Sequence, residues 1–225
     1  MDAAHPPLRT YGRIRSRTLK PRQAELFDTL LPQIALHLDG GIDPAALMPA
    51  AVETWLEIGF GGGEHMAAQA ARRADVLVLG AEPFLNGVGS ALRHIDEGGL
   101  SNVRLHAADA RDLVAALPDA SIDRLFVLFP DPWPKARHRK RRIVNPSTTP
   151  EFVRVLKPGG RLRFATDVAD YADRALETLL AEPLLLWTAG QADDWRRPPA
   201  DHVTTRYEEK RLGDVAPVFF DFVRA

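Results

Sequence analysis

The sequence predicts an α/β fold in which a doubly wound, mostly parallel sheet has helices on both faces. From residue 52 onward, short apolar segments alternate with stretches of helical periodicity, the pattern of parallel strands joined by crossover helices. An acid or a glycine-rich turn follows each of the first five apolar segments. Ligands of open α/β sheets bind beyond the carboxyl ends of the strands, so we expect a functional site at these positions.

The chain before residue 52 is predicted to form a basic arm, a helix and a linker. Between Ala3 and Ala24 there is no acid, and the basic residues there are Arg9, Arg13, Arg15, Arg17, Lys20 and Arg22. Leu26, Leu30 and Ile34 recur every four residues, which predicts an amphipathic helix over Pro21–Leu38. We therefore expect an arm over residues 1–21 and a single domain over residues 22–225.

The remaining elements follow from apolar runs and from helical periodicity. Strands are predicted at Val52–Ile58, Val76–Ala81, Val103–Ala107, Ile122–Phe129 and Arg161–Ala165. Helices are predicted at Glu64–Arg73, Phe84–Glu97, Arg111–Ala116, Pro150–Leu156 and Ala169–Leu180. Apolar segments around Leu184–Thr188 and Val218–Val223 come last, and we expect one antiparallel strand at the carboxyl terminus.

Composition excludes several classes of protein. The 225 residues include 29 Lys+Arg and 30 Asp+Glu, and 45% are hydrophobic, which is an ordinary globular mixture. With no cysteine, the chain has no disulfide, thiol nucleophile or thiolate zinc site, and its seven histidines lack metal-ligand spacing, so no metal is expected. No apolar run is long enough for a membrane span, and the amino terminus lacks the apolar core of a secretory signal. We expect a cytoplasmic protein, either a monomer or a homodimer.

A second basic cluster follows the fourth predicted strand. Residues Lys135–Arg142 read KARHRKRR, with six Lys/Arg in eight positions. Two basic runs in a chain of net charge −1 favour a polyanionic partner such as RNA, although a solvated surface loop is the plainer interpretation of any one run.

The turn after the first strand indicates a nucleotide-type ligand. It reads Glu57-Ile-Gly-Phe-Gly-Gly-Gly63, and the dinucleotide fingerprint fails here because its third glycine position falls on Glu64. The pattern E-x-G-x-G-x-G instead resembles the first motif of Rossmann-like S-adenosylmethionine-dependent methyltransferases. That resemblance implies that Glu57 meets the methionine ammonium directly or through water, that Gly59 and Gly61 also bind the cofactor, that Glu82 accepts the ribose hydroxyls, and that Asp109 receives the adenine amino group.

The turn after the fourth strand suggests a site for a flat base. It reads Phe129-Pro-Asp-Pro-Trp-Pro-Lys135, and the prolines on both sides of Asp131 stiffen it. A carboxylate, an aromatic face and a cation can together hold a nitrogen base and its phosphate. The alternative is a rigid turn whose Trp133 belongs to the core.

The segment FPDPWPKARHRKRRIV resembles the signature of bacterial tRNA (guanine-N7-)-methyltransferases, and LEIGFGGG and Thr205-Arg-Tyr-Glu208 resemble the same family. The resemblance implies methyl transfer from S-adenosylmethionine to guanine N7 in tRNA, in the variable-loop region. It places Asp131 at the catalytic centre, in contact with cofactor and base. It assigns substrate contacts to Lys135, Asp167, Thr205, Arg206, Tyr207 and Glu208. The chain departs from the usual pattern at Pro134, where His is frequent, and at Val168, where Trp is frequent.

Three other functions remain open from the sequence. A methyltransferase for another acceptor, such as an exocyclic amine, would often carry an Asn/Asp-Pro-Pro-aromatic loop, whereas Trp133 stands in the third position here. A non-catalytic RNA-binding protein could keep the fold, but Glu57, Glu82 and Asp131 are all present. A nicotinamide dehydrogenase fits worst because of the glycine spacing.

Overall fold

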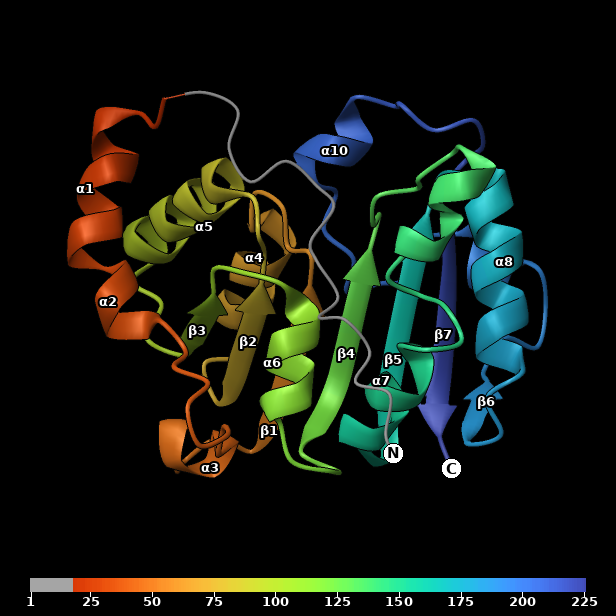
Figure 1. Cartoon of the computed structure of the whole chain (residues 1–225), viewed down its shortest axis with the longest axis horizontal. Coiled ribbons are helices and arrows are strands. Elements are labelled where there is room, and N and C mark those ends of the chain that lie inside the picture. Colours follow the sequence, from red (N-terminus) through yellow and green to blue (C-terminus); the bar gives the residue numbers. More distant parts are fainter. Residues whose placement is uncertain (1–17) are drawn as a thin grey trace, which may run out of the picture.

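The computed structural model describes residues 18–225, so residues 1–17 of the predicted arm, with Arg9, Arg13, Arg15 and Arg17, lie outside the described residues. Seven strands form one sheet in the order β3-β2-β1-β4-β5-β7-β6 (Figure 1). The strands are β1 (Glu53–Ile58), β2 (Val76–Ala81), β3 (Val103–His106), β4 (Ile122–Leu128), β5 (Leu156–Thr166), β6 (Leu185–Trp187) and β7 (Val218–Arg224). The first five are mutually parallel, and β7 is antiparallel to both neighbours, β5 and β6, which confirms the predicted fold class.

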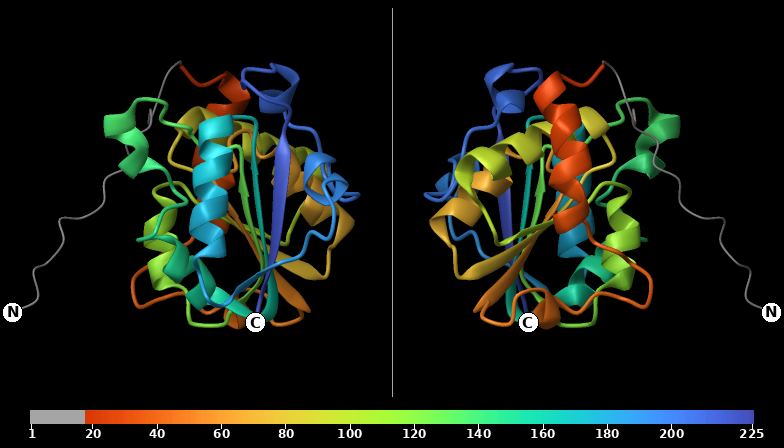
Figure 2. Two further views of the ribbon diagram at one scale, coloured as in Figure 1. Left: turned by 90° about the vertical axis from the view of Figure 1, so that its right-hand side faces the viewer. Right: turned by 90° about the vertical axis from the view of Figure 1, so that its left-hand side faces the viewer.

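Helices cover both faces of the sheet, which Figure 2 shows nearly edge-on. The longer helices are α1 (Pro21–Thr29), α4 (Glu64–Arg72), α5 (Leu85–Gly98), α6 (Ala110–Ala116), α7 (Thr149–Val155) and α8 (Ala169–Leu180). The single-turn helices are α2 (Leu31–Ile34), α3 (Pro44–Leu47), α9 (Asp193–Arg196) and α10 (Arg206–Glu209). A 3-10 helix, η1, spans Ala136–Arg141.

Alternation along the strands divides the buried side chains into two cores. In β1, Leu56 and Ile58 face the core formed with α6, α7 and α8. Trp55 faces the opposite core, formed with α1, α2, α4 and α5. Successive residues of a strand point to opposite faces, so a strand buried on both sides is apolar throughout, as β2 is with six buried residues.

Strand β5 begins five residues before its predicted start. Ile122 of β4 pairs with Leu156, yet Arg124 pairs with Arg161, so Lys157–Gly160 bulges out of the ladder. Gly159 has a positive φ of 78°, and a Cβ on Gly160 would lie 2.8 Å from the carbonyl oxygen of Lys157. The Pro-Gly-Gly sequence therefore forms a bulge within one strand, where we had predicted the boundary between a helix and a strand.

The predicted helix over Pro21–Leu38 is also shorter than expected. It breaks at Leu30 into α1 and α2 and ends at Ile34. Pro32 cannot donate a backbone hydrogen bond within a continuous helix. Beyond the break, Ala35 bridges to Leu105 of β3, and the Leu36 N–H donates to the Leu105 carbonyl. The chain thus leaves the helix to extend beside the edge of the sheet.

The strand order places a topological switch between β1 and β4. From β1 the sheet continues to β2 and β3 on one side and to β4 and β5 on the other. In open α/β sheets, ligands bind in the crevice outside the carboxyl ends of the strands at such a switch, which here corresponds to the loops after β1 and β4. In residues 18–225, no helix combines the length and apolar character needed to cross a membrane.

Candidate active site at the carboxyl ends of the strands

The glycine loop between β1 and α4 lies directly against α5. Gly63, at the start of α4, has a φ of 80°, and a Cβ there would lie 2.5 Å from the Ala91 Cβ of α5. A Cβ on Gly87 of α5 would lie 2.4 Å from the Gly61 carbonyl oxygen. Side chains at either position would separate loop and helix, so the glycines are needed for this packing as well as for the turn.

Glu82, directly after β2, holds the glycine loop from the other side. Its carboxylate accepts hydrogen bonds from the Gly61 N–H at 2.9 Å and from the Phe84 N–H at 2.8 Å. The residue is only 8% exposed, and this burial raises the pKa of Glu82 from its ordinary value of 4.5 to about 7. The negative charge of Asp131 adds to the rise in pKa, so the two predicted acids lie within electrostatic reach of each other.

Asp131 lies on a strained loop after β4. Phe129 and Trp133, on either side of it, have positive φ values of 49° and 41°, which side-chain-bearing residues adopt rarely. The Phe129 N–H donates to the Ala165 carbonyl of β5 at 2.8 Å, which fixes the start of the loop. Asp131 itself is exposed, although the surrounding protein desolvates its carboxyl group enough to raise its pKa.

The basic run after this loop folds back onto it. Arg142 is 3% exposed; its Nε donates to the Pro132 carbonyl at 2.7 Å, and its guanidinium pairs with Asp170 of α8 and lies over the Tyr171 ring. Arg142 is therefore not available to a polyanionic partner, contrary to what its place in the basic run suggests, and it anchors the Asp131 loop instead. Arg141 lies with its guanidinium 4.9 Å from the centre of the Trp133 ring, so Trp133 belongs to the loop and not to the core.

Asp167, after β5, is covered by the carboxyl-terminal part of the chain. It is 4% exposed, and its Oδ1 accepts a hydrogen bond from the Tyr207 hydroxyl at 3.3 Å. The Asp167 carbonyl accepts from the N–H groups of Asp214 and Val215. Burial of the Tyr207 hydroxyl and the nearby charge of Asp167 raise the pKa of Tyr207 to about 12. The Tyr207 ring also contacts Phe129, at 5.6 Å between centroids, so α10 closes over the ends of β4 and β5.

Several predicted site residues have structural contacts of their own. Thr205 and Glu208 cap α10: the Glu208 carboxylate accepts from the Thr205 N–H at 2.8 Å and lies 2.8 Å from His202 Nε2. Asp109 caps α6 and pairs with Arg111. Lys135 and Arg206 are exposed. Their contacts with cofactor or substrate stay predictions.

Glu57 has a partner that sequence reasoning missed. Its Oε2 lies 2.6 Å from Nδ1 of His65 in the first turn of α4, and both residues are buried. The lack of metal-ligand spacing had led us to assign His65 no role. The available signal was its place on the helix that directly follows the glycine loop. Within residues 18–225, no three His, Asp or Glu side chains are grouped so as to hold a metal ion.

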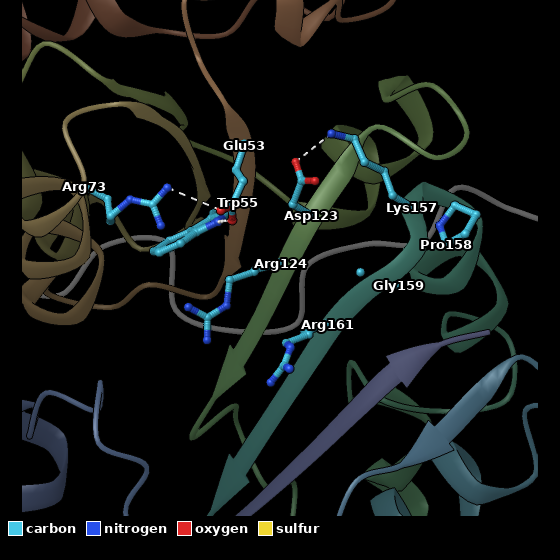
Figure 3. A pocket seen from close by; sticks show the side chains of 10 residues that line it. Glu53, Trp55, Arg73, Asp123, Arg124, Lys157, Pro158, Gly159 and Arg161 are labelled. Atoms are coloured by element: carbon cyan, nitrogen blue, oxygen red, sulfur yellow. Dashed lines mark hydrogen bonds and ion pairs between the residues drawn. The ribbon is translucent and has the colours of Figure 1, made fainter.

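A hollow of about 550 Å³ lies away from these residues, around the opposite ends of β1, β4 and β5 (Figure 3). Trp55, Arg124 and Arg161 lie side by side in its wall because they are register partners on neighbouring strands. Three of its cations already have acidic partners: Arg73 with Glu53, Arg124 with Asp201 and Lys157 with Asp123. With none of the strand-end acids in its wall, this hollow is a weaker candidate than the crevice.

Comparison with known proteins identifies the family. A family model described as "Putative methyltransferase" matches residues 52–219. The tRNA (guanine-N(7)-)-methyltransferase of Caulobacter sp. (strain K31) is 63% identical over 220 residues, which cover 98% of this chain and 96% of that protein. The protein of the same name from Hyphomonas neptunium is 52% identical over 216 residues, covering 96% and 99%. The chain belongs to the tRNA (guanine-N(7)-)-methyltransferase family.

Among solved structures, the 16S rRNA (adenine(1408)-N(1))-methyltransferase from Catenulisporales acidiphilia matches this member of the family with a TM-score of 0.58. The match covers 82% of this chain and 94% of that one at 19% identity, which shows the shared fold. The resemblance in the FPDPWPK and LEIGFGGG segments is thus confirmed, and in this tRNA (guanine-N(7)-)-methyltransferase relative those segments form the two loops that border the crevice.

Arg142→Ala should lower the free energy of unfolding by about 2 kcal/mol, because the Pro132 carbonyl loses its donor and Asp170 keeps only Arg139 of its two cations. Lys140→Ala, an exposed neighbour in η1, is the control and should change stability by less than about 0.5 kcal/mol. Denaturant unfolding of both variants measures the difference. Equal stability of the two would contradict the anchoring role of Arg142.

Proposed function

We propose that this chain transfers a methyl group from S-adenosylmethionine to N7 of a guanine in tRNA, in the variable-loop region. The observation that carries the proposal is the proximity of Glu82, which holds the glycine loop, to Asp131 on the proline-bounded loop of β4. Membership of the family supports the reaction and the class of substrate.

The cofactor side of the site would consist of Glu57, Gly59, Gly61, Glu82, Asp109 and Asp131. The observed geometry fits such a ligand: Gly61 has a positive φ of 54° with open space where a Cβ would lie, and Glu82 is a buried carboxylate whose raised pKa makes further hydrogen-bond donors favourable. Two ribose hydroxyls are donors of this kind. When bound, S-adenosylmethionine supplies an electrophilic methyl group on a sulfonium.

Methylation of guanine N7 does not require the protein to remove a proton. Guanine N7 has an in-plane lone pair and no proton at neutral pH, so no general base is needed as the bond forms. The chain must align the base with the donor and keep water out, and such positioning can lower the barrier by several kcal/mol, up to roughly 10 in ideal cases. The ring becomes cationic, so the carboxylate of Asp131 would stabilise the transition state more than the ground state.

The substrate side would be formed by the loop after β4 and by α10. Lys135 and the exposed cations of η1 would hold phosphates. Asp167 follows β5 and is contacted by Tyr207, and together with Thr205, Arg206 and Glu208 of the same segment as Tyr207 it would fix the base. Tyr207 contacts Asp167, and Glu208 contacts His202. Held by these contacts, Tyr207 and Glu208 would shape a preformed pocket for the base.

Nucleoside analysis tests the function directly. A tRNA transcript incubated with the protein and methyl-labelled S-adenosylmethionine should yield labelled 7-methylguanosine on digestion and mass spectrometry. Label in an N-methylated adenosine or N2-methylguanosine would instead support the other methyltransferase interpretation. Absence of label with retained tRNA binding would support a non-catalytic RNA-binding protein.

Asp131→Asn keeps the size of the side chain and removes its charge. We expect the single-turnover rate at saturating cofactor and tRNA to fall at least about 100-fold, because the charge acts on the cationic transition state. Affinity for tRNA should change little. A folded Asp131→Asn protein with a near-normal rate would show that another group carries this charge stabilisation.

Glu82 should make cofactor binding pH-dependent. The free carboxyl group, with its pKa near 7, is mostly protonated below that pH, and ribose hydroxyls donate to the ionised form. Cofactor affinity should therefore rise from pH 6 to about 7 and level off above it, with at most about a tenfold change per pH unit. In Glu82→Gln the affinity for the cofactor should be lower than in the wild type and should not change with pH. Titration calorimetry measures both. A flat wild-type profile would contradict this role.

The salt dependence of tRNA binding should report the exposed part of the basic run. Lys135, Arg137 and Lys140 to Ala together should flatten the log–log salt slope by at most about one unit for each lost phosphate contact, and leave cofactor affinity unchanged. Arg93, Arg161 and Arg174 to Ala removes the same charge from other elements and is the control. Equal slopes for the two triple variants would mean that the run is a solvated surface.

A further inference from the structure

A chain of hydrogen bonds joins the predicted cofactor acid to the segment that carries the predicted substrate residues. His65 Nδ1 lies 2.6 Å from Glu57 Oε2, and His65 Nε2 lies 3.1 Å from the Gln69 side-chain nitrogen. That nitrogen also lies 2.7 Å from the carbonyl oxygen of Asp201. Glu57, His65 and Gln69 are each less than 5% exposed, so water does not compete for these bonds.

The direction of each hydrogen bond follows from the carbonyl at the end. The Asp201 carbonyl can only accept, so the Gln69 atom that faces it is the amide nitrogen. The same nitrogen donates to His65 Nε2, which must accept, and the imidazole proton is therefore on Nδ1 and is donated to the Glu57 carboxylate. Phe126 packs edge-on against the imidazole at 5.0 Å and holds the ring in this orientation.

Asp201 is the point at which the substrate segment is fastened to the rest of the fold. Its carboxylate accepts from Arg163 of β5 at 2.6 Å and from Arg124 of β4 at 2.8 Å. These cations lower the pKa of Asp201 to about 2. Its carbonyl binds α4 through Gln69 and Arg72. The next residue, His202, contacts Glu208 of α10, so the position of Asp201 sets the position of the cap of α10.

The helix itself does not need Gln69 to hold its place. Asn102 donates from its side chain to the carbonyls of Ala70, Arg73 and Val76, which fastens the carboxyl-terminal end of α4 to the sheet. Met66 and Ala70 pack in the core on the same helix. The bond from Gln69 to Asp201 therefore fixes the segment after Asp201 relative to the glycine loop.

We propose that His65 and Gln69 are positioning residues through which an occupied cofactor site strengthens tRNA binding by the Asp201–Glu208 segment. The proposal rests on the proposed function. The ammonium group of a bound cofactor would restrict the motion of the Glu57 carboxylate. Each further group in the chain of hydrogen bonds must act as the donor or acceptor that its neighbour requires. Ordering of the first group thus reduces the cost of ordering the last when tRNA arrives. By reciprocity, tRNA would strengthen cofactor binding by the same factor.

The experiment measures the tRNA dissociation constant with and without saturating S-adenosylhomocysteine, which occupies the cofactor site without turnover. For the wild type, we expect tRNA to bind at least about fivefold more tightly with the ligand present. Gln69→Met breaks the chain of hydrogen bonds between His65 and Asp201 at similar volume, while Arg72 keeps its own bond to the Asp201 carbonyl, and it should bring this ratio to about one. Its affinity for S-adenosylhomocysteine, measured without tRNA, should stay within about twofold of wild type because Glu57 and His65 are untouched.

A second variant breaks the chain at another bond. His65→Asn places an amide nitrogen where Nδ1 lies, so it retains a donor to Glu57 and loses the acceptor for Gln69. It should also bring the ratio to about one, and it carries the test by itself if Gln69→Met does not fold. Asn102→Ala is the matched control: it weakens the anchoring of the same end of α4 without removing any bond of the chain from Glu57 to Asp201, so it should lower the melting temperature while keeping the wild-type ratio.

A wild-type ratio of one would overturn the proposal, and so would a wild-type ratio retained by folded Gln69→Met or folded His65→Asn. A ratio lost equally in Asn102→Ala would also overturn it, because general loosening of α4 would then explain the effect. Nucleoside analysis of the same wild-type preparation separates this failure from failure of the proposed function. Production of 7-methylguanosine together with a ratio of one rejects the coupling alone.

Discussion

The buried carboxylate of Glu82 is the contact on which the proposed cofactor side of the site depends. It accepts hydrogen bonds from the glycine loop at Gly61 and from the start of α5 at Phe84, so one side chain joins the segments that follow β1 and β2. Burial works against its charge, and the negative charge of Asp131 adds to that effect. The protein thus keeps an acid in a position where hydrogen-bond donors from a ligand relieve an unfavourable state. Relief of this kind favours binding of a polyhydroxylated ligand over an apolar one of the same size.

The loop of Asp131 is held in place from its other side. Arg142 bonds to the Pro132 carbonyl and to Asp170 of α8, so the last residue of the basic run belongs to the scaffold and only the exposed cations of the run are available to a polyanion. Positive φ values at Phe129 and Trp133 mark backbone strain at this loop, and such strain persists only where surrounding contacts enforce it. Opposite the loop, α10 packs through Tyr207 on Phe129 and Asp167. The strands therefore contribute position, and the loops after β1, β2, β4 and β5 contribute the chemical groups.

The parts of this arrangement that could be predicted are those in which a residue acts through its own local sequence. Alternating apolar segments predicted the parallel strands, and the acids that follow those strands lie at their carboxyl ends as expected, where we propose the site. The Lys157–Gly160 bulge was missed because Pro-Gly-Gly is typical of the boundary between a helix and a strand. Only the pairing of β4 with residues on both sides of the bulge shows that the strand is continuous. Gln69 and Arg142 were missed for a different reason. Each bonds to a backbone carbonyl, that of Asp201 or Pro132, and such partners leave no pattern in the sequence. His65 lies only eight residues from its partner Glu57, but a single histidine at the start of a helix is a weak signal.

The central claim of this account is that the donated methyl group lies between the glycine loop and the Asp131 loop. S-adenosylmethionine carrying a ¹³C-labelled methyl group, bound to the protein without tRNA, allows that position to be read from intermolecular nuclear Overhauser effects. The account predicts contacts from the methyl protons to the protons of Pro130, Asp131 and Pro132. Contacts instead to the Trp55 ring and Arg161, in the hollow at the opposite ends of the strands, would contradict it.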